Sequence, residues 1–337
     1  MSAFEPSVTN GAGIDGAALA DAAAAIEASQ KIVLACHINP DGDALGSLLA
    51  LGLAIEARYP EKDVTLISRD GVPDIYRFLP HCERIQQNTD RRDFDLAIVL
   101  DSGDLKRIGE AVVPVILSAP VQMDIDHHVG EGAFGAVRLL NSRAAATAEI
   151  VFDLVGALGQ AVTPDIARCL LTGVITDTGS FRFMNVTPRT LRVAATLIEQ
   201  GASPALIAEQ VFDNRAFAAT RLMGLALSSL SHTPDGRITW AHVSHESFTE
   251  TGAVDEETEG LINFVRAVRG TEIALLFREI RPGMIRISLR SVDGRDVAAI
   301  AAQFGGGGHR MAAGCSYPGT LSDAETALLA ACRAALE

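Results

Sequence analysis

Short apolar runs alternate with longer amphipathic segments through the first 200 residues. The runs are continuous, as in residues 32–36 (Ile-Val-Leu-Ala-Cys), which is typical of strands buried on both faces of a sheet. The segments between them have the length and composition of helices. The pattern predicts strands at 32–36, 64–68, 96–100 and 121–125, and helices at 17–29, 44–58, 146–158, 164–176 and from Pro188. We therefore expect an α/β domain, a parallel sheet with helices on both faces.

The pattern changes after residue 203. Residues 204–230 have a mostly helical character and are interpreted as a linker, before a turn at Thr233-Pro-Asp-Gly. The segments expected beyond it are strands at 237–243, 272–279 and 284–291, a helix at 296–304, a glycine loop at 305–308 and a last helix from Ser322. This order predicts a smaller α+β domain over residues 231–337, with an antiparallel or mixed sheet. Residues 1–16 are expected to be a disordered tail before a domain over 17–203.

Composition narrows the class of protein. The chain has 337 residues, 48% of them hydrophobic and 21% charged, as in an ordinary soluble protein of two domains. The net charge of −14 disfavours long nucleic acid as the main partner, because its many phosphates would be repelled. We expect a cytoplasmic protein without a membrane partner, because neither a basic, apolar leader nor a stretch long enough to span a bilayer is recognisable. Five scattered cysteines without CxxC spacing indicate reduced thiols.

Acidic and histidine residues follow four of the expected elements. A His-x-x-x-Asp-x-Asp segment follows the strand 32–36, two aspartates follow the strand 96–100, an Asp-His-His triplet follows the strand 121–125, and an aspartate ends the helix 164–176. The residues are His37, Asp41, Asp43, Asp101, Asp104, Asp126, His127, His128 and Asp177. Because a parallel sheet collects its ligands at the carboxyl ends of its strands, we expect these side chains to lie together.

This set of side chains suits a divalent metal. Imidazole and carboxylate groups without thiolates bind hard or borderline ions such as Mn²⁺, Mg²⁺ or Co²⁺. Asp41 and Asp43 repel each other unless a cation or a donor lies between them. Two cations about 3.5–4 Å apart that share a carboxylate form the usual centre for phosphate-ester hydrolysis. A lone His37 or Asp101 is more often a cap or a turn former than a ligand, and Asp177 alone is as readily a cap, but the complete set predicts metal-assisted phosphate chemistry.

The order of the four motifs resembles that of the DHH phosphoesterase superfamily. Residues 305–314 (Gly-Gly-Gly-Gly-His-Arg-Met-Ala-Ala-Gly) resemble the glycine-rich motif of its DHHA1 domain. The two resemblances together extend from about residue 17 to 320. The length and the pair of domains are similar to those of the nanoRNase and pAp phosphatase branch. The resemblance therefore implies a hydrolase that acts on short nucleotide phosphates.

The resemblance also implies a role for each residue. Asp101 would bridge two divalent ions, which are expected to be Mn²⁺, with Mg²⁺ or Co²⁺ as alternatives. The ligands of one ion would be His37, Asp41 and Asp101, and those of the other Asp43, Asp101, His127 and Asp177. His128 would face the substrate phosphate and act with Asp101 as a catalytic residue. Asp126, and by analogy Asp104, would orient a ligand, although Asp104 is equally well explained as a turn residue.

In the second domain the resemblance implies a site for the terminal phosphate of the substrate. Its residues would be Arg290, Gly306, Gly307, Gly308 and His309. Glycines let backbone N–H groups approach an anion, and arginine pairs with phosphate in a bidentate manner. The implied substrates are short oligoribonucleotides, the linear dinucleotides pApA and pGpG, 3′-phosphoadenosine 5′-phosphate and cyclic di-AMP. A homodimer is plausible from the resemblance alone.

Three alternatives stay open at this point. A RecJ-like single-strand exonuclease would need a basic track, against which the net charge argues. A family II pyrophosphatase would carry an Arg-Lys-Lys type motif in place of the glycine segment. A nucleotide-binding sensor without catalysis would not need a complete set of metal ligands.

Thr147 also matches a polar segment near the family's site, but it is explained equally well as a helix N-cap.

Overall fold

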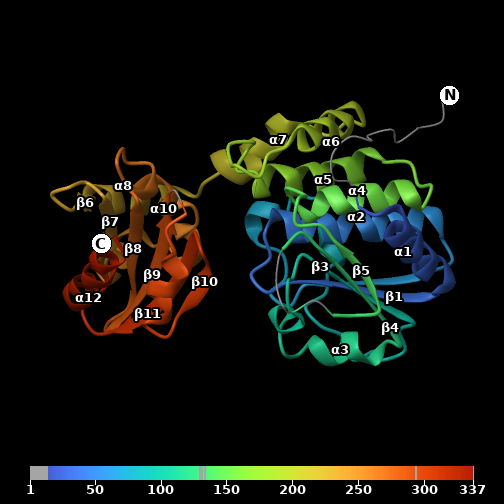
Figure 1. Cartoon of the computed structure of the whole chain (residues 1–337), viewed down its shortest axis with the longest axis horizontal. Helices are drawn as coiled ribbons and strands as arrows, with labels where there is room; N and C mark the ends of the chain where they lie inside the picture. The colour runs from blue at the N-terminus through green and yellow to red at the C-terminus, as the bar shows by residue number, and fades with distance from the viewer. Residues whose placement is uncertain (1–13, 129–131, 133, 293, 337) are drawn as a thin grey trace. The chain divides into compact units, whose positions relative to one another are not determined.

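The computed structural model describes residues 14–128, 132, 134–292 and 294–336 (Figure 1). The chain divides into two compact units, residues 1–214 and 215–337. The predicted tail, residues 1–16, lies outside the described part except for its last three residues. Of these, Asp15 accepts a hydrogen bond from the Ala17 amide and caps the first helix, which begins at Gly16.

The first unit is built on five parallel strands in the order β2-β1-β3-β4-β5. The strands are β1 (Lys31–Cys36), β2 (Asp63–Ile67), β3 (Leu96–Leu100), β4 (Val121–Asp126) and β5 (Val137–Leu140). The first four were predicted from their apolar runs. β5 was missed because it is a four-residue edge strand with only one buried side chain, Leu139, and so lacks the apolar run of an interior strand.

Helices cover both faces of this sheet, as predicted (Figure 1). Alternate residues of β1 show why: Ile32 and Leu34 belong to the apolar core on one face, and Val33 belongs to the core on the other. The helices on the first face are α1 (Gly16–Ala28), α2 (Gly42–Arg58), α4 (Thr147–Ala157), α5 (Pro164–Asp177) and α6 (Pro188–Glu199). The short α3 (Val113–Ser118), which was not predicted, lies on the second face. No helix within the described residues is long and apolar enough to cross a membrane.

The predicted linker, residues 204–230, is helical over most of its length. It contains α7 (Pro204–Ala208), one turn of π-helix η4 (Glu209–Asp213) and α8 (Phe217–Ser228). The division between the two units falls between the last two of these elements. α8 packs on the second unit, where Leu222 and Ala226 are buried against its sheet.

The second unit contains a six-stranded mixed sheet in the order β10-β11-β9-β8-β7-β6, in which only β7 and β8 pair in parallel. The strands are β6 (Ser231–His232), β7 (Ile238–Val243), β8 (Ile273–Arg281), β9 (Met284–Ser291), β10 (Gly307–His309) and β11 (Ala312–Pro318). One face packs on α11 (Val297–Ala302) and α12 (Leu321–Ala334). The other packs on α8, α9 (His245–Thr251) and α10 (Leu261–Arg266). This is the predicted α+β architecture.

The prediction of a glycine loop at 305–308 was wrong in its second half. Gly307 and Gly308 belong to β10, which pairs antiparallel with β11. A Cβ at Gly308 would lie 2.6 Å from the carbonyl oxygen of Ala312, so only glycine allows this close pairing. Because glycines are uncommon in strands, the sequence favoured a loop here. In the structure, pairing with β11 makes these residues an edge strand of the sheet.

Asp124, an acidic residue of β4 outside the predicted motifs and two positions before Asp126, is buried in the first unit. Its neighbours along β4, Met123 and Ile125, belong to the core under α2, so Asp124 points to the face that carries α3. Its Oδ2 accepts a long hydrogen bond of 3.5 Å from the Phe134 amide, and Oδ1 has no partner among the described residues. Burial, and then the charge of Asp126, raises the pKa of Asp124 to about 7.

Asp124 should therefore lower the stability of the protein as the pH rises from about 4 to 7. Across this window the native state keeps a proton that the unfolded chain releases, which costs up to roughly 4 kcal/mol. Asp124→Asn should remove this cost, so its advantage over the wild type should grow between pH 4.5 and 7.5. Urea unfolding of both proteins in EDTA across this pH range measures the difference in their free energy of unfolding. A difference that does not change with pH would contradict the burial of a protonated Asp124.

Candidate active site

The predicted motifs meet at the carboxyl edge of the parallel sheet. His37 directly follows β1, Asp101 directly follows β3, and Asp126 is the last residue of β4. The chain passes from β1 to β2 on one side and then returns to β3 on the other, and ligands bind to such sheets at this reversal. Asp177, the last residue of α5, reaches the same place, since its Oδ2 lies 3.1 Å from Nε2 of His127.

Asp43 is fully buried and is held by the first turn of α4. Its Oδ2 accepts a hydrogen bond from the Thr147 amide at 2.6 Å, and its Oδ1 accepts one from the Ala148 amide at 2.9 Å. The hydroxyl of Ser47 adds a longer hydrogen bond at 3.3 Å. The free N–H groups and the dipole of a helix N-terminus stabilise a carboxylate. Asp43 is thereby fixed in one orientation, with its charge partly balanced.

Asp101 lies at the centre of the cluster. Its Oδ2 is 3.6 Å from Nε2 of His37, and its Oδ1 is 3.5 Å from Nε2 of His127 and 3.4 Å from Nδ1 of His128. The Thr147 hydroxyl donates a hydrogen bond of 3.0 Å to Oδ1. The backbone of Asp101 has a φ of 56°, a left-handed conformation that costs of order 1–3 kcal/mol outside glycine. This strained residue turns its two oxygens toward different histidines.

Two groups of metal-binding atoms adjoin Asp101. One consists of His37, Asp41 and Asp101, and the other of Asp43, His127 and Asp177. Within each group the potential ligand atoms lie within 4.8 Å of one another. Because Asp101 Oδ1 also approaches His127, this carboxylate adjoins both groups. The structure thus brings together the residues of each ligand set that the family resemblance implied, with Asp101 in the first group and next to the second.

The donor chemistry fits divalent cations. Nε2 of His127 is buried and has no hydrogen-bond partner among the described residues, although three carboxylates surround it. Its Nδ1 lies 3.3 Å from the carbonyl oxygen of Ala144, which as an acceptor favours the proton on Nδ1 and leaves the Nε2 lone pair for a metal. A buried imidazole nitrogen without a hydrogen-bond partner, surrounded by carboxylates, is a site where a bound cation would supply the missing interaction.

The pKa shifts within the cluster indicate that it lacks positive charge. Burial, and then the charges of Asp41 and Asp177, raises the pKa of Asp101 well above its usual range. Burial also raises the pKa of Asp43, followed by the charges of Asp101 and Asp177. Burial lowers the pKa of His127, but the Asp177 carboxylate 3.1 Å from Nε2 and the charges of Asp43 and Asp101 outweigh this effect and raise the pKa to about 10. Metal binding would therefore displace protons from this site.

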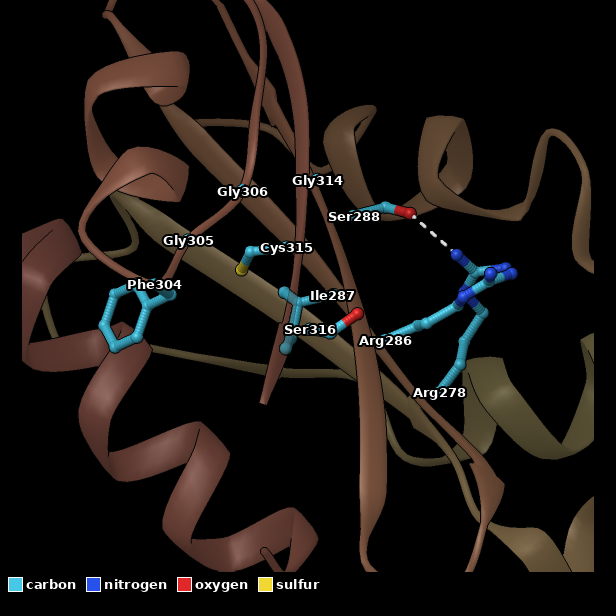
Figure 2. A pocket seen from close by; sticks show the side chains of 10 residues that line it. All are labelled: Arg278, Arg286, Ile287, Ser288, Phe304, Gly305, Gly306, Gly314, Cys315 and Ser316. Atoms are coloured by element: carbon cyan, nitrogen blue, oxygen red, sulfur yellow. Dashed lines mark hydrogen bonds between the residues drawn. The ribbon is translucent and has the colours of Figure 1, made fainter. Parts of the chain in front are cut away.

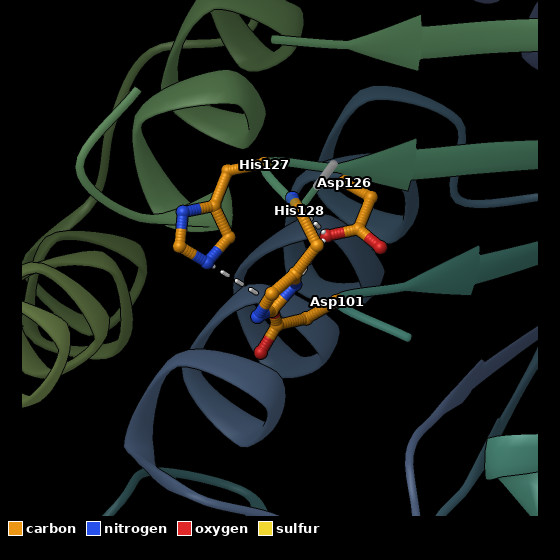
Figure 3. Close-up of side chains that lie close together, drawn as sticks. All are labelled: Asp101, Asp126, His127 and His128. Atoms are coloured by element: carbon orange, nitrogen blue, oxygen red, sulfur yellow. Dashed lines mark hydrogen bonds and ion pairs between the residues drawn. The ribbon is translucent and has the colours of Figure 1, made fainter. Parts of the chain in front are cut away.

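Asp126 orients His128 (Figure 3). Its Oδ1 accepts hydrogen bonds from the His128 amide at 2.9 Å and from Nδ1 of the same residue at 2.7 Å, and its Oδ2 accepts one from the Gly103 amide. Asp126 also lies close enough to Asp101, His127 and His128 to belong to a further donor group. Since both of its oxygens already accept hydrogen bonds, the geometry suits an orienting residue better than a ligand.

Asp104 has a local role. Its side chain accepts a hydrogen bond of 2.8 Å from the Lys106 amide and caps the short helix η3 (Leu105–Ile108). Its backbone carbonyl accepts a hydrogen bond from the Ser102 hydroxyl. Among the described residues it belongs to none of the metal-binding groups. These contacts correspond to the turn interpretation of Asp104 rather than to the orientation of a ligand.

The predicted substrate-binding residues of the second unit lie on β9, β10 and the segment before β10. Ile285, Ile287 and Leu289 of β9 face the core under α12, so Arg286, Ser288 and Arg290 share the opposite face. Arg290 is half-buried, and its guanidinium donates to the Leu289 carbonyl at 3.0 Å. Gly306 precedes β10, which contains Gly307, Gly308 and His309. The side chain of His309 lies outside the described part of the structure.

A hollow of about 380 Å³ opens on this unit (Figure 2). Gly306 lines it, whereas Arg290, Gly307 and Gly308 do not. The other lining residues include Arg278, Arg286, Ser288, Phe304, Gly305 and Gly314. The sequence analysis missed both arginines. The period-two alternation of β9 could have indicated Arg286, but Arg278 depends on the pairing of β8 with β9.

Asn185 and Ser47 are further site residues that the sequence analysis missed. The Asn185 side chain donates hydrogen bonds of 3.0 Å to the carbonyl oxygens of Asp177 and Ala145, which joins the end of α5 to the segment before α4. Ser47 holds Asp43. Thr147 is the first residue of α4 rather than its N-cap, which is Ala146, so its hydroxyl is directed to Asp101. No local sequence signal distinguishes these roles.

Comparison with known proteins identifies the family. The DHH family N-terminal domain matches residues 31–174, and the DHHA1 domain matches residues 242–337. The chain is 34% identical over 292 residues to a Thermus thermophilus protein, covering 86% of this chain and 84% of the relative. The chain therefore belongs to the DHH phosphoesterase family and is a hydrolase.

That relative is named bifunctional oligoribonuclease and PAP phosphatase NrnA. A Bacillus subtilis protein of the same name is 27% identical, over 85% of this chain and 88% of its own length. The solved structure of an exopolyphosphatase-related protein from Bacteroides fragilis has a TM-score of 0.89 and 28% identity, and covers 96% of this chain and 99% of that one. The RecJ structure with Mn²⁺ from Thermus thermophilus shares only the fold, with a TM-score of 0.57 at 14% identity, over 96% of this chain and 56% of RecJ.

The position of Asp43 depends on Gly173 of α5, which makes a prediction possible. A Cβ at Gly173 would lie 2.5 Å from Oδ1 of Asp43 and 2.8 Å from Cβ of Ala148. Gly173→Ala should therefore displace Asp43 from the α4 N-terminus and weaken Mn²⁺ binding by roughly tenfold or more. Calorimetric titration with Mn²⁺ measures the loss.

Gly156→Ala is the matched control. Gly156 is also inside a helix, but a Cβ there meets nothing within 4 Å, so this variant should bind Mn²⁺ normally and gain up to about 1 kcal/mol of stability. Equal Mn²⁺ affinities of the two variants would show that Gly173 has no part in positioning Asp43.

Proposed function

We propose that this chain is a two-metal hydrolase of short oligoribonucleotides that also removes the 3′ phosphate of 3′-phosphoadenosine 5′-phosphate. The pair of donor groups around Asp101 is the observation that carries the proposal, because a shared carboxylate suits a two-metal centre. The similarity to the Thermus thermophilus oligoribonuclease and PAP phosphatase over most of both chains supports the choice of substrate.

Each residue has a distinct role in this proposal. His37, Asp41 and Asp101 would hold one ion, and Asp43, Asp101, His127 and Asp177 would hold the other. We assign Mn²⁺ because carboxylates and imidazoles without thiolates suit it. Bound ions of this kind lower the pKa of water and withdraw charge from the phosphate oxygens. The N-terminus of α4 keeps Asp43 and Asp101 in place, so the ligands need little reorganisation.

His128 is the candidate for proton transfer to the leaving oxygen. The Asp126 carboxylate accepts a hydrogen bond from Nδ1 at 2.7 Å, which fixes the ring and the tautomer. Nε2 is then the atom that contacts the substrate phosphate or the leaving oxygen. Hydrogen bonds from His128 outweigh the effect of burial and hold the pKa of Asp126 below its usual range. Asp126 therefore stays ionised and keeps His128 oriented.

In the second unit, the face of β9 with Arg286, Ser288 and Arg290 is the proposed site for the terminal phosphate of the substrate. Asp255 accepts hydrogen bonds from Arg278 at 2.7 Å and Arg286 at 2.8 Å, so two of the arginines are already paired. Arg290 has no ion pair among the residues described and is the arginine left for an anion. Recognition of a terminal phosphate would favour pApA and pGpG, with cyclic di-AMP as a poorer substrate because it has no phosphate end.

Turnover of a substrate panel tests the function. With Mn²⁺, the protein should cleave pApA, pGpG and a five-nucleotide RNA and release phosphate from 3′-phosphoadenosine 5′-phosphate. Asp101→Asn should lower kcat by at least roughly 10³-fold, because a neutral amide bridges two cations poorly, while it tolerates the same backbone conformation. Faster degradation of long single-stranded DNA would favour an exonuclease, and no turnover with any divalent ion would favour a sensor.

A second measurement tests the terminal phosphate site. Arg290→Ala should raise KM for pApA by roughly tenfold with a small change in kcat, because a charge-assisted pairing distant from the reacting bond contributes to binding. The matched substrate ApA, which has no 5′ phosphate, should be cleaved equally by the variant and the wild type. An equal effect on both substrates would place Arg290 outside the phosphate site.

A further inference from the structure

Arg107 lies among three of the metal motifs although it belongs to none of them. It is in η3, which follows the Asp101 segment. Its backbone carbonyl accepts a hydrogen bond of 2.7 Å from the amide of Ile38, the residue after His37. Its guanidinium donates a hydrogen bond of 3.1 Å to the carbonyl of Ser102, the residue after Asp101. Arg107 is thereby held beside the cluster at both its backbone and its side chain.

The guanidinium adjoins the space next to His128. Gly103 has a φ of 64°, and a Cβ built on it would lie 3.6 Å from Oδ2 of Asp126, 3.7 Å from Cβ of His128 and 3.8 Å from an Nη atom of Arg107. The three groups therefore surround the open side of Gly103. The Arg107 guanidinium and the His128 side chain thus both lie within 4 Å of one point at Gly103, and His128 is the histidine that faces the substrate in the proposed function.

Among the described residues, most of the hydrogen-bonding capacity of Arg107 is unused. A guanidinium has five N–H donors, and within the described residues only the bond to Ser102 engages one of them. Arg107 forms no ion pair with a carboxylate in that part of the chain, although the surroundings are acidic and the net charge is −14. By contrast, Arg189, on α6, donates two hydrogen bonds of 2.6 Å to Asp153. The half-buried Arg107 thus retains its charge for an anion.

We propose that Arg107 is a phosphate-binding residue of the active site, which pairs with an oxygen of the scissile phosphate beside His128. This role rests on the proposed phosphoesterase function. The scissile phosphate gains negative charge on its oxygens in the transition state, and a fixed guanidinium stabilises this charge without reorganising. The planar fork of arginine can engage an oxygen while one N–H group remains on Ser102.

A purely structural role is the competing explanation. Arg107 could serve only to hold the Ser102 carbonyl and so to shape the loop that carries Asp101. In that case its replacement would disturb the metal ligands first and the phosphate only as a consequence. Arg107→Gln separates the two roles, because its amide can still donate to the Ser102 carbonyl but carries no charge.

The experiment measures two affinities by calorimetry, that of Mn²⁺ for the protein and that of inorganic phosphate for the Mn²⁺-loaded protein. Arg107→Gln should bind phosphate roughly tenfold or more weakly than the wild type with the Mn²⁺ affinity unchanged. Arg107→Lys, which keeps the charge without the fork, should fall between them. Lys106→Ala is the matched control, since Lys106 is an exposed cation in the same helix, and it should bind phosphate like the wild type.

Two results would overturn the proposal. One is a phosphate affinity of Arg107→Gln equal to that of Lys106→Ala. The other is a parallel loss of Mn²⁺ and phosphate affinity in both Arg107 variants, which would identify a structural role. Turnover of pApA in the same proteins separates this question from the proposed function. A wild type that binds phosphate through Arg107 but cleaves no nucleotide would refute the function and leave the phosphate site standing.

Discussion

The rest of the site depends on the hydrogen bonds from the first turn of helix α4 to two buried carboxylates, those of Asp43 and Asp101. Ionised acids inside a protein are costly unless hydrogen bonds or opposite charge compensate them. The amides of Thr147 and Ala148 hold Asp43, and the Thr147 hydroxyl holds Asp101. These hydrogen bonds balance only part of the charge, since the pKa values of both acids stay raised. The fold thus supplies the geometry of a metal centre and leaves the remaining charge for cations to balance.

Close packing between helices α2 and α5 allows Asp43 to contact the N-terminus of α4. α2 carries Asp43 and packs directly on α5, where a side chain at Gly46 would collide with the Cys169 carbonyl and one at Gly173 would collide with Asp43. Larger residues at these glycines would separate the helices and move Asp43 away from α4. The stability of the core and the position of the metal ligands therefore depend on the same contacts.

The two units cluster side chains of opposite charge. The first gathers carboxylates at one edge of its sheet, and the second gathers arginines on one face of its own. Asp255 pairs with Arg278 and Arg286 and limits their mutual repulsion, while Arg290 lacks such a partner among the residues described. In the proposed function, this division of charge would let a chain with a net charge of −14 bind a small anion at a few built positions, whereas a long nucleic acid would be repelled.

The sequence by itself determined the strands β1, β3 and β4 and the identity of the acids and histidines after them, because an apolar run followed by polar residues is a local pattern. It also determined the class of both domains. Only the tertiary structure decided that Thr147 holds residues 104 and 46 positions away, that Arg107 and His128 meet around Gly103, and that Gly307 and Gly308 form an edge strand. These features arise where segments distant in sequence pack together. The direction of a side chain and the pairing of a weak strand are set there by neighbours that no local pattern specifies.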